Sequence, residues 1–186
     1  MLLQRKTLIC LAIALMFGGL AFVLSQPSIN SATEATAWQP LFNFTETQIV
    51  GLTIFVQGHV LVFEQEILLS SQWQMLEPQR AAASSGVVRF LTNLLVNPQG
   101  HKSFPVTAAQ LADYGLDQPS AAVTVRLADN TTHQLTLGVS NYDKTKVYAQ
   151  VDGGLEVWVL PIEFRDAVMR DLRDWFGPTE MVDVLS

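Results

Sequence analysis

The side chains that could perform catalysis are few and scattered along this sequence. Ser84 and Ser85, followed by Gly86, are the densest group of possible nucleophiles, and no Gly-x-Ser-x-Gly elbow surrounds them. Glu64 and Glu66 lie two residues apart, so on a β-strand both carboxylates would point to one face, as an acid–base pair requires. Nothing marks that pair as buried. We interpret the serines as the polar start of a helix and the glutamates as solvated carboxylates.

Metal and cofactor chemistry has equally little support. The three histidines, His59, His101 and His133, are far apart and show no spacing typical of metal ligands. The only cysteine, Cys10, lies in an apolar run, where we interpret it as an ordinary buried residue. The sequence has no His-Glu-x-x-His pair, no phosphate loop and no Gly-x-Gly-x-x-Gly motif. We therefore predict no catalytic residue, no metal site and no cofactor, and expect a protein that is not an enzyme.

The charge of the chain argues against nucleic acid as a partner. The formal net charge is -6, with 11 basic and 17 acidic residues among 186. Two of the basic residues, Arg5 and Lys6, stand at the extreme N-terminus, so the remainder is still more acidic. A surface of this sign repels phosphate backbones and anionic lipid headgroups. A cationic surface on a partner protein stays compatible with it.

One apolar segment explains the high mean hydropathy of +0.25. Residues 8–24 contain no charge, and with their flanks they would form a helix of roughly 30 Å, about the thickness of a hydrocarbon core. A cleaved signal peptide is the alternative, but small residues at a suitable cleavage distance are missing. Because Arg5 and Lys6 precede the run and no Lys or Arg follows it before Arg80, the N-terminus should stay cytoplasmic. Either fate of the run exports the rest of the chain, to a periplasm or a thylakoid lumen.

Hydrophobic periodicity predicts the elements of the exported part. Alternating apolar runs predict a hairpin over residues 49–64 with its turn at Gln57-Gly58-His59, a short strand around Trp73, and four further strands. The three- and four-residue spacing after Gln79 predicts a helix that stops before Pro98. Thr107 and Gln110 form a capping box for a second helix, which Gly115 would end. The four later strands are expected over residues 122–127, 133–137, 146–151 and 155–160.

A third helix is expected from Pro161 to Gly177, with Val168, Leu172 and Trp175 on one face. The predicted fold is therefore α+β, with antiparallel sheets formed by a hairpin and a four-strand meander, packed with about three helices. The boundaries that we expect are an anchor over 1–25, a tether over 26–37, a folded domain over 38–178 and a tail over 179–186.

The order of these elements resembles domain-of-unknown-function family 4340. The most specific part of the resemblance is Tyr114-Gly115-Leu116 with Pro119, followed by an alternating strand and by Leu137-Gly138; the likeness runs roughly from Phe44 to Trp175. The resemblance implies an exported or membrane-anchored domain without an assigned reaction, and some relatives are associated with transport or gliding-motility machinery. It also implies that Gly138 forms a turn. The few lysines look compatible with a cyanobacterial relative.

These observations predict a membrane-anchored, noncatalytic accessory or assembly module that binds a membrane-protein complex, with transport or photosynthetic machinery as candidates. Trp175 and Phe176 precede an apolar tail and either pack back on the sheet or contact that partner. A domain that binds a small molecule or a glycan is the alternative, followed by an unrecognised hydrolase.

Overall fold

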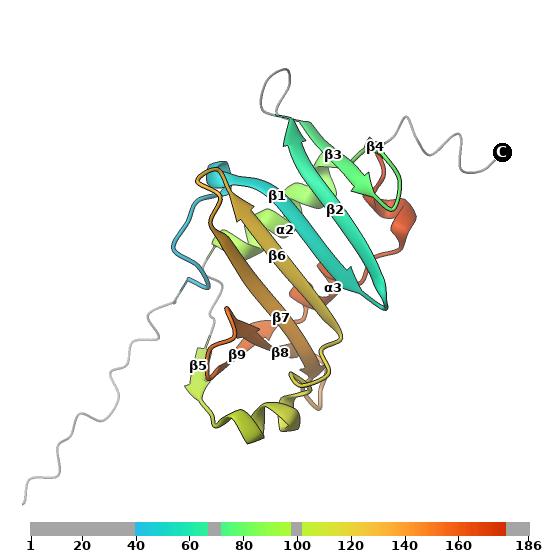
Figure 1. Ribbon diagram of the computed structural model, residues 1–186. Coiled ribbons are helices and arrows are strands. Elements are labelled where there is room, and N and C mark those ends of the chain that lie inside the picture. Colours follow the sequence, from blue (N-terminus) through green and yellow to red (C-terminus); the bar gives the residue numbers. More distant parts are fainter. Residues whose placement is uncertain (1–39, 67–71, 98–101, 178–186) are drawn as a thin grey trace, which may run out of the picture. The chain divides into compact units, whose positions relative to one another are not determined.

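The computed structural model describes residues 40–66, 72–97 and 102–177. Within them lies an antiparallel sheet of nine strands in the order β4-β3-β2-β1-β6-β7-β8-β9-β5 (Figure 1). In chain order the strands are β1 (Ile49–Val56), β2 (His59–Glu66), β3 (Gln72–Glu77), β4 (Ala81–Ala82), β5 (Lys102–Pro105), β6 (Ala121–Leu127), β7 (Thr132–Ser140), β8 (Lys146–Val151) and β9 (Glu156–Pro161). The predicted α+β class with antiparallel strands is confirmed.

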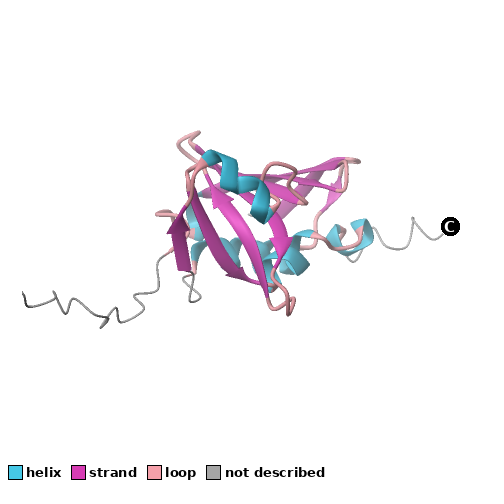
Figure 2. Cartoon of the chain, turned by 90° about the horizontal axis from the view of Figure 1, so that it is seen from below, coloured by secondary structure: helices cyan, strands magenta, loops and turns pink. Residues whose placement is uncertain are grey.

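The helices lie on both sides of this sheet (Figure 2). The α-helices are α2 (Ser85–Val96) and α3 (Glu163–Val168), and three 3-10 helices accompany them: η1 (Glu46–Gln48), η2 (Ala108–Tyr114) and η3 (Leu172–Trp175). The two α-helices share one apolar core with the sheet, whereas η2 packs near β5, β7 and β8 through Tyr114.

The predicted hairpin and meander are not separate sheets, because β1 of the first pairs with β6 of the second. Ile54 lies opposite Val123, and Leu52 lies opposite Val125. All four side chains are buried on the same face of the sheet. Joining the two halves at this seam makes one continuous apolar surface, which buries more side chains than two small sheets could bury separately.

The core forms where that surface meets the helices. Strand β6 shows the alternation most clearly, since Ala121, Val123, Val125 and Leu127 are buried while the residues between them are partly exposed. Helix α2 contributes a stripe at three- and four-residue spacing, consisting of Val88, Leu91, Leu94 and Leu95. Fully burying such a side chain contributes about 1.5–3 kcal/mol, so packing rather than local propensity holds the fold together.

Two predicted helix boundaries were wrong. The helix expected from Gln79 begins at Ser85, because residues 81–82 pair with β3 as strand β4 before the chain turns at Ser84. The helix expected from Pro161 to Gly177 is broken after Val168, where Met169 adopts φ -87° and ψ 34°. The break leaves Leu172 with 42% of its surface exposed, whereas Val168 and Trp175 are buried, so these three residues do not share one helical face.

The capping box at Thr107 forms, although the helix it begins is the 3-10 helix η2. The Thr107 backbone N–H donates to Gln110 Oε1 at 2.9 Å, and Gly115 ends η2 in the left-handed conformation with φ 68°. The prediction of a turn at Gly138 was wrong, because this residue lies inside β7. A Cβ atom at Gly138 would overlap the backbone carbonyl oxygen of Tyr114, so glycine here permits η2 to touch the strand.

The N-terminal end of the described chain is fastened by an aromatic cluster around His133. The His133 ring lies 5.5 Å from the ring of Phe42 and 5.3 Å from that of Phe44, measured between centroids. His133 Nδ1 lies 2.8 Å from a carboxylate oxygen of Asp152, whose other oxygen accepts the Gln134 backbone N–H. The segment Leu41–Phe44 is thereby held against the core.

We expect His133→Ala to lower the free energy of unfolding by about 1–2 kcal/mol, because it removes two ring contacts and a hydrogen bond. Backbone amides of residues 41–44 should exchange hydrogen faster in this variant, as measured by mass spectrometry. His59→Ala is the control, since within the described ranges the imidazole of His59 bonds only to the Gln57 carbonyl oxygen of its own turn. Equal protection of residues 41–44 in both variants would contradict the fastening role.

Among the described residues, no helix is long and apolar enough to cross a bilayer. The predicted anchor, tether and tail, as well as His101, lie outside the described residues.

Candidate functional site

The predicted partner contacts Trp175 and Phe176 lie inside the domain. Trp175 is 0% exposed and its ring packs 5.0 Å from that of Phe63, while Phe176 is 6% exposed and bridges to Ala83. Both side chains pack within the described domain, residues 178–186 lie outside the described residues, and contact of this segment with a partner stays a prediction.

The residues with catalytic side chains are not brought together. Glu64 forms an ion pair with Arg126, with 2.6 Å between a carboxylate oxygen and a guanidinium nitrogen. The two residues lie on opposite sides of Gly51 in the sheet, and the missing side chain of that glycine leaves room for the Arg126 guanidinium. Ser84 and Ser85 stand at the start of α2, as predicted. Within the described ranges, no three His, Cys, Asp or Glu side chains gather as a metal site would require.

Two carboxyl groups of the described chain have a perturbed pKa. The two carboxyl groups with clearly lowered pKa values, Asp129 and Asp143, are both in turns. The pKa of Asp129 is lowered chiefly by the hydrogen bond from the Thr131 hydroxyl, and that of Asp143 by the equivalent bond from Thr145. These are local turn contacts that stabilise the backbone.

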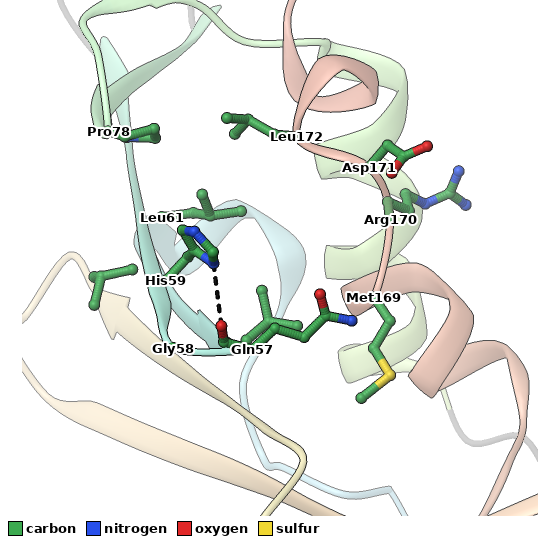
Figure 3. A pocket seen from close by; sticks show the side chains of 11 residues that line it. Gln57, Gly58, His59, Leu61, Pro78, Met169, Arg170, Asp171 and Leu172 are labelled. Carbon is green, nitrogen blue, oxygen red and sulfur yellow. Dashed lines mark hydrogen bonds between the residues drawn. The ribbon is translucent and has the colours of Figure 1, made fainter.

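The feature best suited to binding is an apolar hollow of about 400 Å³ between the β1–β2 turn and the segment that links α3 to η3 (Figure 3). We refer to it as the hollow. Its apolar lining consists of Val56, Val60, Leu61, Pro78, Met169 and Leu172. Gln57, Gly58, His59, Arg170 and Asp171 complete the wall.

Three chain segments position this lining. Gln57 and Gly58, with φ 51° and 79°, form the tight turn that the sequence predicted, and the hairpin register places Val56 opposite His59 and Leu61 opposite Ile54. Pro78 follows β3 through a cis peptide bond. The break between α3 and η3 supplies the opposite wall, and there Leu172 extends toward Pro78 and Leu61 (Figure 3).

The charged side chains at the hollow do not point into it. Arg170 and Asp171 extend to the side away from Leu61 (Figure 3). The Arg170 guanidinium lies over the Phe90 ring at 5.5 Å, a cation–π contact, and its buried Nε atom has no hydrogen-bond partner among the described residues. His59 bonds back to Gln57 at 3.1 Å. A wall of this kind can accept an apolar group but offers no acid–base pair for catalysis.

The sequence did not predict the hollow. Its walls come from residues near 60, 78 and 170, and only the tertiary fold brings these segments together. Leu172 is the residue that most clearly marks the hollow. The sequence analysis missed its role because the helix expected across 161–177 placed Leu172 on the face that packs on the core. A second depression of about 330 Å³ around Glu64, Glu66 and Arg80 is polar, and the ion pair of Glu64 with Arg126 occupies part of its lining.

Comparison with known proteins gives one match. No curated protein and no solved structure matches the chain. The model of the family described as Domain of unknown function (DUF4340) matches residues 73–182, which is more than half of the 186 residues. The matched part includes β3 apart from its first residue, strands β4 to β9, the Tyr114-Gly115-Leu116 element and two of the three walls of the hollow. On this match, the chain belongs to the DUF4340 family.

Proposed function

We propose that this chain is a noncatalytic accessory or assembly module that binds a membrane-protein complex, and that the hollow receives an apolar side chain of the partner. The observation that carries the proposal is the hollow itself, an apolar recess in which Leu172 is 42% exposed and shares the lining with the buried Val56 and Leu61. Large apolar side chains seated in such recesses commonly supply most of the affinity of a protein interface.

The chemistry of the wall favours a protein partner. Six of its residues are apolar, and Gln57 and His59 provide polar groups that can bond to a partner's backbone at the rim. An apolar centre with a polar rim is the usual organisation of a protein–protein contact. The volume of about 400 Å³ also falls within the range of small-molecule pockets, which keeps a small apolar ligand as the second candidate.

The proposal places the module at a membrane. Residues 8–24 would retain it there, and the basic Arg5 and Lys6 would keep the N-terminus in the cytoplasm, with the domain in the periplasm or thylakoid lumen. Anchoring restricts the search for a partner to the same membrane, so a single recess of modest area can be sufficient for association.

We expect Leu172→Asp to reduce capture of the partner at least about tenfold, because the substitution places a carboxylate in the apolar contact. The experiment is native purification of the tagged full-length chain from detergent-solubilised membranes, with quantification of every co-purifying protein. Thermal unfolding should change little, since 42% of the Leu172 surface is already exposed to water in the free domain.

Leu155→Asp is the matched control. Leu155 is 54% exposed in the turn between β8 and β9 and does not line the hollow. A protein lost from Leu172→Asp but retained by Leu155→Asp identifies the partner of the hollow. If both variants retain the same proteins while native mass spectrometry shows a small molecule lost from Leu172→Asp, the second candidate replaces the first.

A further inference from the structure

The lysines of the described chain gather near one end of the sheet. Lys102 begins β5, Lys146 begins β8, and Lys144 lies in the turn just before β8. Both strands are neighbours of β9 (Figure 1), where the partners of Lys102 and Lys146 are residues 159 and 161, only two positions apart. We refer to Lys102, Lys144 and Lys146 as the lysine cluster.

The strand register places two of these lysines on the side of the sheet where η2 lies. Lys102 and Tyr148 both lie opposite Val159, and residues directly opposite one another share a face. The Tyr148 ring packs on Tyr114 of η2, with 4.9 Å between the ring centroids. Lys146 is two residues before Tyr148 in the same strand, so it lies on that face as well.

No carboxylate on these strands balances the lysine charges. The positions of β5, β8 and β9 on this face hold no Asp or Glu, and none of the three lysines forms an ion pair with another described residue. Asp143 is next to Lys144, but its carboxylate accepts bonds from the Thr145 N–H and hydroxyl, at 3.0 and 2.6 Å, and so faces its own turn. In a chain of net charge -6, the lysine cluster is a local reversal of sign.

A fully exposed aromatic side chain accompanies the lysine cluster. Tyr142, two residues before Lys144 in the turn between β7 and β8, is 104% exposed. Tyrosine and lysine together are typical of the membrane–water interface, where the ring lies among the headgroups and the ammonium groups contact anionic lipid. An aromatic anchor for a protein partner more often lies in a packed recess, and Tyr142 lines neither of the two depressions described above.

We propose that the lysine cluster and Tyr142 form a docking face for an anionic lipid surface. The lysines contact the phosphate groups of the lipids, and the Tyr142 ring enters the headgroup layer. A lysine close to such a surface multiplies the docked population about fivefold, so three lysines together multiply it about a hundredfold. The docking face shares no residue with the hollow, so it goes beyond the function proposed above and can be tested separately.

A fluorescent label at position 142 tests the docking in the full-length chain. In a Cys10→Ala background, which removes the only natural cysteine, Tyr142→Cys carries an environment-sensitive fluorophore. The protein is reconstituted with vesicles of phosphatidylcholine alone or mixed with phosphatidylglycerol. We expect the emission to shift to shorter wavelength only with phosphatidylglycerol, and to return when salt screens the charges. Leu155→Cys with the same label is the control for position, since Leu155 is 54% exposed at the opposite end of β8.

Two sets of substitutions show whether the lysine charges cause the shift. Replacing the lysine cluster by glutamine should lower the ratio of docked to free label about a hundredfold, whereas replacing it by arginine should retain docking, because arginine keeps the charge. Equal shifts with neutral and anionic vesicles, or in the glutamine and arginine variants, would overturn the inference. An acidic protein lost from the glutamine variant, with no shift on vesicles in the parent, would replace the lipid by a protein partner. None of these results affects the proposed function, which is tested by capture through Leu172.

Discussion

Replacing Trp175 by alanine is expected to lower the free energy of unfolding by about 3–5 kcal/mol. The indole is fully buried, packs on Phe63, and belongs to the one core that α2, α3 and the sheet share. Removing it leaves a large cavity beside the segment that closes the β4 edge. The measurement is chemical denaturation of the full-length protein in detergent, which reports the difference between the variant and the parent.

Trp175→Phe separates the loss of packing from the loss of the indole N–H. The Nε1 atom is buried without a hydrogen-bond partner among the described residues, so a phenyl ring removes an unsatisfied donor together with some volume. We expect this variant to lose less than half as much stability as Trp175→Ala. Similar losses for both would show that the N–H has a partner that stabilises the fold.

Gly138→Ala is expected to destabilise the protein by about 3 kcal/mol or more. The added Cβ would overlap the backbone carbonyl oxygen of Tyr114, which a side-chain rotation cannot relieve. Because the next residue, Gly115, has φ 68° and its own hydrogen faces Val139, the backbone of η2 has little freedom to withdraw. Thermal unfolding and the protection of the η2 amides from hydrogen exchange should both report the loss.

Gly86→Ala is the matched control for the same chemical change. No atom lies within 4 Å of a Cβ built at Gly86, and the residue is in the first turn of α2, where alanine favours the helix. We expect the control to be neutral or slightly stabilising. A loss at Gly86 as large as that at Gly138 would mean that the contact with Tyr114 is not the cause.

The long strands could be predicted from the sequence because their periodicity has a direct physical origin. In β6, one face of the strand is buried on the core and the other is not, so apolar and polar residues alternate at period two. The turn at Gln57-Gly58 could also be predicted, since Gly58 adopts its positive φ angle without steric cost; Gln57, at φ 51°, is not a residue type that favours such an angle. The start of η2 at Thr107 and its end at Gly115 could also be predicted, because a capping box and a left-handed cap each require particular residue types.

The short elements could not be predicted in this way. Strand β4 has two residues and β5 has four, too few to show any period, and both are defined by pairing with distant strands. The break after Val168 has no proline or glycine to mark it. Packing of Trp175 against Phe63 and the edge of β4 determines it instead, and such contacts are not visible in local sequence.

The hollow could not be predicted from local sequence patterns, because its lining residues are far apart in the chain. Leu61 and Leu172 are 111 positions apart, and neither is unusual in its own segment. The two leucines differ from other apolar residues of the chain only in that the tertiary fold places both in the lining of the hollow. The sequence predicted Trp175 and Phe176 as possible partner contacts; both are buried in the core of the described chain, and their contact with a partner stays a prediction.

The seam between β1 and β6 has a consequence for how the chain reaches its native state. The hairpins on either side of it close over a few residues, whereas pairing Ile54 with Val123 requires the whole intervening chain to close as a loop. Contacts of such long range slow folding, so we infer that seam closure limits the rate. The family match begins at Trp73, after β1 and β2, although these strands lie in the middle of the sheet. A fragment limited to the matched residues would contain β3 and β4 on one side and β5 to β9 on the other, without β1 and β2, which connect the two groups. We therefore expect that such a fragment would not fold by itself.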